Sequence, residues 1–185
     1  GPVSGHGAPG AAHGFGGYAT ADKLPSITDI LDKGPGVNSN AVRIIKKPGE
    51  SFKYSGGGTT IVQLLVEEIT GLPYEDYIQK TVFTPLNMTS SFYSVNQRGK
   101  EDLLATAHYF NGKPRKNLYQ HYPESAAAGV WTTPTDLSKL MIDLMLSGRG
   151  EKGHLLQPET VREMLTPPIT GENNALGLFI SQKGE

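Results

Sequence analysis

The chain has 185 residues, enough for one domain with a hydrophobic core, and its formal net charge of −1 excludes a broad basic surface for nucleic acid. It contains no cysteine, which excludes disulfides, thiolate zinc sites and a cysteine nucleophile. No apolar run approaches the roughly 20 residues that a membrane-spanning helix needs.

The N-terminal stretch differs in composition from the rest of the chain. Residues 1–17 are mostly Gly, Ala and Pro, which bury little apolar area, so we expect a flexible tail or a protease-cleavage remnant followed by a helical domain over 18–185. His6 and His13 lie in this stretch, but two ligands fall short of a metal site. We therefore expect neither a metal nor another cofactor.

Local signals predict three helices in the first half of the chain. Residues 24–34 read as a short helix that Ser26 or Thr28 caps and Gly34 ends. An amphipathic helix follows, ended by Gly71, with its apolar stripe at Ile61, Leu64, Leu65 and Ile69. Residues 73–83 begin with a proline and predict a third helix.

The second half predicts a hairpin, two helices and a strand. Residues 106–116 alternate into Asn111-Gly112, the preferred two-residue hairpin turn. A helix capped by Thr133 and ended by Gly148 should bury Leu137, Leu140, Met141, Leu144 and Met145. Residues 157–168 predict a short helix stopped by prolines, and 173–185 predict a C-terminal strand without a following partner.

The pair Tyr54-Ser55 stands before three glycines at the start of the second helix. One interpretation is structural: the glycines supply positive backbone angles or close packing, and the tyrosine is a half-buried aromatic. The other is functional, because free amides at a helix start beside a phenol and a hydroxyl form a polar site. The residues alone leave both open, since Ser55 has no adjacent histidine and Lys53 breaks the G-x-S-x-G pattern.

Longer segments resemble the serine β-lactamase-related hydrolases, which include class C β-lactamases, D-alanyl-D-alanine peptidases and related esterases. The resemblance rests on "PGESFKYSGGGTTIVQLLVEEITGLPYEDYIQKTVFTPLNMTSSFY" and on "AAAGVWTTPTDLSKLMIDLMLSG". It extends from about residue 18 to residue 181. It implies the helical middle region of a β-lactamase/transpeptidase-like fold, of mainly helical α+β class, with a short hairpin and an orphan C-terminal strand.

The resemblance also implies site residues. Tyr54 matches the family's proton-transfer tyrosine, and Ser55 occupies the middle position of the Tyr-x-Asn motif. Gly56 stands where many members have asparagine, so one polar contact to substrate is missing. Gly129 matches the later glycine-rich segment, and Trp131, the single tryptophan, is a candidate for the wall of the substrate cleft.

Two parts of the family's machinery are not found in the sequence. No Ser-x-x-Lys occurs, and Thr20-Ala-Asp-Lys23 has the spacing but a threonine in place of the serine. The Lys/His-x-Gly strand, which would follow "GLFISQKGE", is also missing. We therefore expect a truncated serine acyl hydrolase that is inactive alone, because chemistry that depends on a positioned set of groups does not survive loss of the nucleophile.

Two other functions stay open: a non-catalytic module that binds a peptide, an acyl ligand or a partner, and an engineered scaffold without a function of its own. We also expect self-association through apolar faces that the missing sheet would cover. The family resemblance suggests a bacterial periplasmic or secreted parent protein.

Overall fold

The computed structural model describes residues 15–47, 49–93, 99, 101–114, 119–151 and 155–181. Within these ranges the chain is mainly helical, with one two-stranded antiparallel sheet, as the sequence predicts. The elements are α1 (Ile27–Asp32), α2 (Gly56–Thr70), α3 (Tyr74–Ile78), the π-helical turn η1 (Gln79–Phe83), β1 (Phe92–Tyr93), the 3₁₀ turn η3 (Glu101–Leu103), α4 (Ser125–Ala128), β2 (Val130–Trp131), α5 (Pro134–Gly148) and α6 (Pro158–Leu165).

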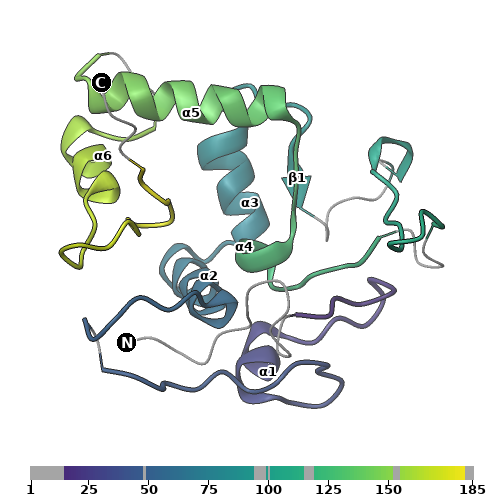
Figure 1. Cartoon of the computed structure of the whole chain (residues 1–185). Helices are drawn as coiled ribbons and strands as arrows, with labels where there is room; N and C mark the ends of the chain where they lie inside the picture. Colours follow the sequence, from purple (N-terminus) through teal and green to yellow (C-terminus); the bar gives the residue numbers. More distant parts are fainter. Residues whose placement is uncertain are drawn as a thin grey trace.

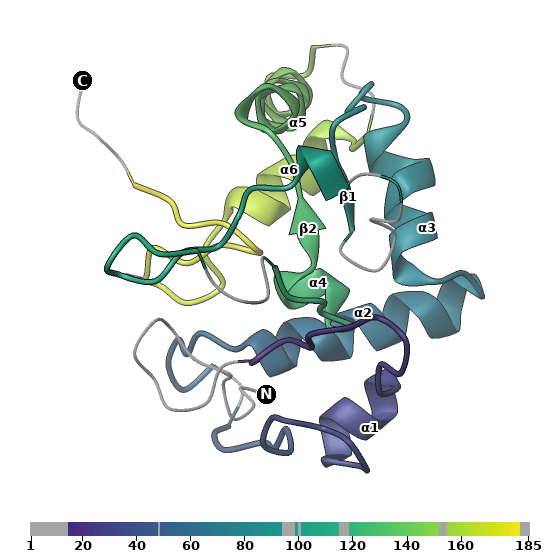
Figure 2. The same cartoon turned by 90° about the vertical axis from the view of Figure 1, so that its right-hand side faces the viewer.

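The helices are arranged in tiers. Figures 1 and 2 show α1 below α2, then α3, α4 and the strand pair above α2, and α5 at the opposite end of the molecule. Contacts join α2 to α1, α3 and α4, and α5 to α6. Helix α2 is therefore the element on which the lower half of the structure is assembled.

The helix ends follow the capping chemistry that the sequence predicts. Ser26 caps α1 in a reciprocal capping box with Asp29, and Thr133 accepts a hydrogen bond from the backbone amide of Asp136 at 3.2 Å. Gly71 ends α2 with a left-handed φ of 66°, a conformation that costs glycine little. Helix α1 ends one residue earlier than predicted, at Lys33, which itself adopts φ 63°.

The predicted hairpin is wider than expected. His108 bridges Pro114, and the amide of Tyr109 donates to the carbonyl of Lys113 at 2.8 Å, so residues 110–112 form the loop in place of a two-residue turn; the amide of Gly112 closes it on the carbonyl of Tyr109 at 2.9 Å. Asn111 uses its side-chain oxygen to accept from the Lys113 amide at 3.1 Å. This local hydrogen bond and the left-handed Gly112 (φ 78°) stabilise the longer turn.

The sheet is formed by segments far apart in sequence, and the predicted C-terminal strand is folded back. Phe92 pairs with Trp131 and Tyr93 with Val130. At the C-terminus the chain reverses at Gly177, where φ is 79°, so that Asn174 faces Phe179. No neighbouring strand among the described residues is available to this segment, so its backbone groups pair locally instead.

The best-packed core lies between α3, η1, β1 and α5. Phe83 stacks on Tyr93 with ring centroids 5.8 Å apart, and Tyr74 meets Tyr93 edge-on at 5.6 Å. Other members of this core are Ile78, Val82, Leu86, Met88, Leu140 and Leu155. The core fixes β1, and through it the position of β2.

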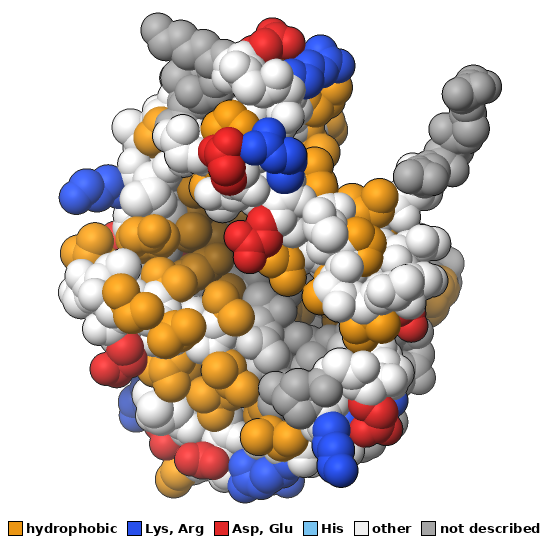
Figure 3. Space-filling view, turned by 90° about the vertical axis from the view of Figure 1, so that its left-hand side faces the viewer, with side chains coloured by type: hydrophobic (Ala, Val, Ile, Leu, Met, Phe, Trp, Pro, Cys, Tyr) orange, Lys and Arg blue, Asp and Glu red, His pale blue; other side chains and the backbone are white. Residues whose placement is uncertain are grey.

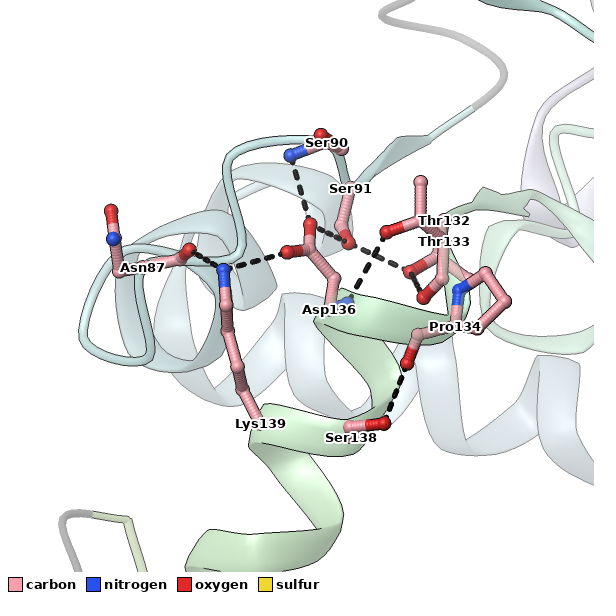
Figure 4. Close-up of polar contacts among 9 residues, drawn as sticks. All are labelled: Asn87, Ser90, Ser91, Thr132, Thr133, Pro134, Asp136, Ser138 and Lys139. Carbon is pink, nitrogen blue, oxygen red and sulfur yellow. Dashed lines mark hydrogen bonds and ion pairs between the residues drawn. The ribbon is translucent and has the colours of Figure 1, made fainter.

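A buried carboxylate ties the strand pair to α5. Figure 4 shows Asp136 accepting hydrogen bonds from the Ser90 amide and the Ser91 hydroxyl, both at 2.8 Å, and pairing with Lys139 at 2.8 Å. The Ser91 hydroxyl also contacts that of Thr132 at 2.8 Å. Burial opposes ionisation, but the hydrogen bonds from Lys139, Ser91 and Ser90 outweigh it and lower the pKa of Asp136.

The apolar face of α2 points away from the rest of the protein. Its buried face consists of small and polar residues: Gly56, Gly57, Thr60 and Gln63. On the opposite face Leu65 is 55% exposed and Ile69 is 74% exposed. Figure 3 shows hydrophobic side chains gathered on one side of the molecule, around a hollow. A face of this kind favours association with another apolar surface.

The predicted buried face of α5 is only partly correct. Leu144 is buried and Leu140 packs against the core. Leu137, Met141 and Met145 are about half exposed instead, since no described element covers this side of the helix. The apolar stripe indicates a contact face, but its burial depends on a partner for that face.

Replacing Asp136 by alanine should destabilise the fold by about 3 kcal/mol, because the change removes the acceptor of the Ser90 amide and one of two partners each of the Ser91 hydroxyl and the Lys139 ammonium. Urea unfolding followed by circular dichroism measures the change. The matched control is Asp32→Ala, whose partner Arg43 lies at 3.4 Å with both side chains exposed. Equal losses in the two variants would contradict a structural role for the buried cluster.

Replacing both Leu65 and Ile69 by lysine should weaken self-association at least about tenfold, because two apolar contacts are replaced by charges. Sedimentation velocity over a wide concentration range measures this. Leu103→Lys, at a residue that is 75% exposed on η3, serves as the control. A wild-type protein that stays monomeric at every concentration would rule out association through this face.

Candidate functional site

The Tyr54-Ser55 pair lies at the entry to α2, and the structure gives the serine a structural task. Ser55 has an extended backbone (φ −150°, ψ 104°), and its hydroxyl accepts from the Gly58 amide at 2.9 Å. Its carbonyl accepts from the Thr59 amide at 3.3 Å. Ser55 is thus the N-cap of α2, a role in which its hydroxyl oxygen accepts a backbone hydrogen bond.

The three glycines after Ser55 form the first turn of α2 rather than a separate loop. None of them has a positive φ, so the expectation of positive backbone angles is wrong here. Gly56 and Gly57 are buried, which agrees with the close-packing interpretation. Gly56 therefore contributes a helix-start amide and a small surface, and no side chain to a ligand.

Tyr54 is the exposed member of the pair. Half of its side chain (51%) is open to solvent. Among the described residues no cationic side chain is bonded to its hydroxyl. The phenol is therefore accessible to a ligand from outside, and it lacks the neighbour that would activate it as a base.

Gly129 ends α4 where no side chain fits. Its amide donates to the Ser125 carbonyl at 3.0 Å, and an added Cβ would lie 2.8 Å from the Ser125 Cα. The two residues after it form β2. Gly129 thus positions β2 by allowing a close turn, and any contribution to substrate binding would come from its backbone.

Trp131 belongs to an aromatic group on one face of the strand pair. Its ring lies edge-on to Tyr119 with centroids 6.3 Å apart, and Tyr119 lies edge-on to His121 at 5.8 Å. Its neighbours Val130 and Thr132 point to the other face, because side chains alternate along a strand. Trp131 is half-buried, so one side of the indole is available for contact.

The other face of the strand pair borders an apolar cavity of about 470 Å³. Helix α3, the turn η1 and helix α5 contribute most of its walls. The lining residues are Tyr77, Ile78, Thr81, Val82, Phe83, Met88, Tyr93, Val130, Thr132, Leu137, Leu140, Leu144, Leu155, Leu156 and Met164. Its size falls within the range of small-molecule sites, and its lining favours uncharged ligand groups.

The structure brings some of the predicted site residues together and leaves others apart. Helix α4 packs on α2, so Gly129 and Gly56 lie on neighbouring elements. Within the described parts of the chain, no hydrogen bond or ring contact joins Tyr54 or Ser55 to Trp131. The candidates therefore lie on two neighbouring elements, the start of α2 and the α4–β2 segment.

Two polar residues that the sequence analysis did not select hold α4 in place. Gln63 donates to the Pro123 carbonyl and accepts from the Ala126 amide, both at 3.1 Å. Ser125 donates a short hydrogen bond to the carboxylate of Glu75 on α3. A signal for Gln63 was available, because it interrupts an otherwise apolar stretch of α2.

Glu124 is the most unusual residue of this region. It is fully buried (0% exposed), and neither of its carboxylate oxygens has a hydrogen-bond partner. Burial raises its pKa to about 7. It is the only acidic or basic residue between Lys116 and Asp136, with histidine left aside, which is the sequence signal that could have identified it.

No metal centre is indicated by the described residues. They contain no group of three or more His, Asp or Glu side chains placed to hold an ion. His6 and His13, the candidates from the sequence, lie outside the described residues. Within the same ranges no helix combines the length and apolarity needed to cross a bilayer.

Comparison with known sequences identifies a family. The profile of the family described as Beta-lactamase matches residues 37–184. The acyltransferase mokF of Monascus pilosus is 28% identical over 139 residues, covering 69% of this chain and 32% of that protein. A putative D-alanyl-D-alanine carboxypeptidase of Escherichia coli K12 is 25% identical over 85 residues, covering 46% of this chain and 19% of that protein.

Solved structures share the fold. The D-amino acid amidase of Ochrobactrum anthropi SV3, in complex with D-phenylalanine, superposes with a TM-score of 0.66 at 20% identity, covering 92% of this chain and 51% of that chain. A penicillin-binding protein of Bacillus halodurans gives a TM-score of 0.62 at 24% identity, covering 85% and 47%. The chain thus spans about half the length of these structures and a third or less of the curated relatives.

Replacing Ser55 by alanine should cost about 1 kcal/mol of folding stability, because the amide of Gly58 loses its acceptor at the start of α2. Tyr54→Phe is the matched control, since it removes only an exposed hydroxyl and should change stability by less than about 0.5 kcal/mol. Thermal unfolding of both variants measures the difference. A stability loss confined to Tyr54→Phe would contradict the capping role.

Proposed function

The chain belongs to the Beta-lactamase family, and from this membership we propose that it is part of a serine acyl hydrolase acting on a β-lactam, a D-Ala-D-Ala peptide or an ester. The observation that carries the proposal is the profile match over residues 37–184, which includes Tyr54 at the entry to α2. The relatives include an acyltransferase, a carboxypeptidase and an amidase, whose names all describe reactions at an acyl carbon.

In this proposal the reaction has two steps. A serine hydroxyl attacks the acyl carbon, the bond to the leaving amine or alcohol breaks, and the hydroxyl proton passes to that leaving group. Water then cleaves the acyl-enzyme ester and regenerates the serine. Tyr54 would carry the proton in both steps, a role supported by its exposed phenol at the site entrance.

The same residues support an inactive state for the 185-residue chain alone. The sequence contains no Ser-x-x-Lys, and the Ser55 hydroxyl is occupied in capping α2. Tyr54 has no bonded cation within the described residues. Gly56 offers only backbone where many family members have an asparagine side chain. Each of these features removes a group on which acylation depends.

A second candidate function is non-catalytic binding, in which the surfaces on either side of β2 bind a ligand and no reaction follows. The apolar cavity of about 470 Å³ behind β2 favours this function, because it would accept the uncharged part of an acyl or peptide ligand. Trp131, on the opposite face of the strand, would offer an aromatic surface to the same class of ligand. The two candidates differ in whether a covalent intermediate forms.

Incubation with benzylpenicillin and, separately, with a fluorophosphonate should leave the intact mass of the folded chain unchanged, because no activated serine is available. Intact-mass spectrometry measures this, and circular dichroism verifies that the sample is folded. Saturable binding of penicillin without a mass change, measured by calorimetry, would favour the binding module.

A stoichiometric adduct on any serine would overturn the inactive state. In that case Tyr54→Phe is the informative variant. A loss of labelling rate of about a hundredfold would support proton transfer by Tyr54. An unchanged rate would remove Tyr54 from the mechanism.

A further inference from the structure

Glu124 is a buried acid whose charge is poorly stabilised, because burial outweighs the favourable effect of its own backbone amide on the carboxyl pKa. Its side chain is 0% exposed, and both carboxylate oxygens lack a hydrogen-bond partner. An ionised carboxylate in such a place is costly, whereas the protonated form is not. The packing around Glu124 therefore favours the protonated side chain and disfavours the ionised one.

The segment that carries Glu124 is held on both sides by its neighbours. The carbonyl before it and the amide two residues after it bond to Gln63 on α2, both at 3.1 Å. The next residue, Ser125, bonds to Glu75 on α3. Upstream, the backbone of His121 exchanges two hydrogen bonds of 2.8 Å with that of Tyr18. All of these contacts use atoms other than the Glu124 carboxylate, so that side chain is free to titrate.

Within the described residues, no lysine or arginine forms an ion pair with Glu124. The titratable groups on the surrounding elements are Tyr18 in the N-terminal segment, Glu67 on α2, Glu75 on α3 and His121 on the segment itself. Burial raises the pKa of Tyr18, the hydrogen bond from Asn38 opposes this, and the Glu124 charge adds to the rise.

Movement of α4 would reach the candidate substrate wall directly. Gly129 is held tightly against α4, because its amide donates a hydrogen bond to the Ser125 carbonyl and its Cα hydrogen faces the Ser125 Cα. β2 begins at the next residue and carries Trp131, which contacts Tyr119. A displacement of Ser125 therefore displaces the indole.

We propose that Glu124 is a proton-controlled switch: the protonated side chain holds α4 between α2 and α3, and its ionisation releases α4 and moves the β2 segment that carries Trp131. Burial raises the pKa of Glu124 from 4.5 to about 7, so the switch operates near neutral pH. The folded chain binds more protons than the unfolded chain between these values. Stability therefore falls as the pH rises through this window and reaches its lower level above about pH 7.

Trp131 is the only tryptophan, so its fluorescence reports on the switch without labelling. Trp131 emission, measured from pH 5 to pH 9, should show one transition centred near pH 7, whereas the stability from urea unfolding, measured from about pH 4 to pH 9, should fall until about pH 7 and then level off. Across the window from 4.5 to about 7, the ratio of folded to unfolded chain should fall by about two orders of magnitude. Glu124→Gln, which is neutral at every pH, should remove the transition and raise stability at pH 8.

The matched control is His121→Gln, because this ionisable side chain lies on the same segment with its ring centroid 5.8 Å from that of Tyr119. The proposal requires the transition to persist in this variant. A transition that survives in Glu124→Gln, that disappears in His121→Gln, or that is missing from the wild-type protein overturns it.

A measurement on the wild-type chain makes the test independent of how the variants fold. The ¹³C shift of the Glu124 carboxyl, in protein labelled at glutamate, follows its ionisation directly. Titration near pH 7 that coincides with the change in Trp131 emission supports the switch. Titration near 4.5 overturns it.

Discussion

The hydrogen bonds of one side-chain amide organise the lower half of this protein. Gln63 lies on the buried face of α2, donates to one backbone carbonyl before α4 and accepts from one amide inside it. Because both contacts are to backbone groups, they fix the position and the rotation of α4 relative to α2. The short hydrogen bond of Ser125, the burial of Glu124 and the turn at Gly129 all follow from this placement.

Two buried carboxylates show how local contacts decide the charge of an acid. Asp136 is surrounded by donors from Ser90, Ser91 and Lys139, and these contacts lower its pKa. The Glu124 carboxylate accepts no hydrogen bond from another described residue, and burial raises its pKa to about 7. Burial disfavours the charged form in both places, so hydrogen bonding makes the difference. One acid fastens the strand pair to α5, and the other leaves α4 sensitive to protons.

The parts of the fold that could be predicted are those set by neighbouring residues in sequence. Caps at Ser26 and Thr133 and the left-handed stop at Gly71 depend on one turn of chain, and they occur as expected. The faces of α2 and α5 depend on what covers them, which periodicity does not reveal. For the site, family resemblance selected Tyr54, whereas Glu124 and Gln63 gain their importance only from contacts between distant segments.

The strand pair β1–β2 is a partition one residue thick. On β2, Val130 and Thr132 border the apolar cavity, while Trp131 between them belongs to the aromatic group with Tyr119. Each side chain of β2 thus contacts only one face of the strand pair. A substitution at one position therefore alters the apolar cavity or the aromatic group, but not both. Insertion or deletion of a single residue would have a different effect, because it exchanges the two faces. Evolution along this strand is therefore expected to proceed by replacement at fixed length.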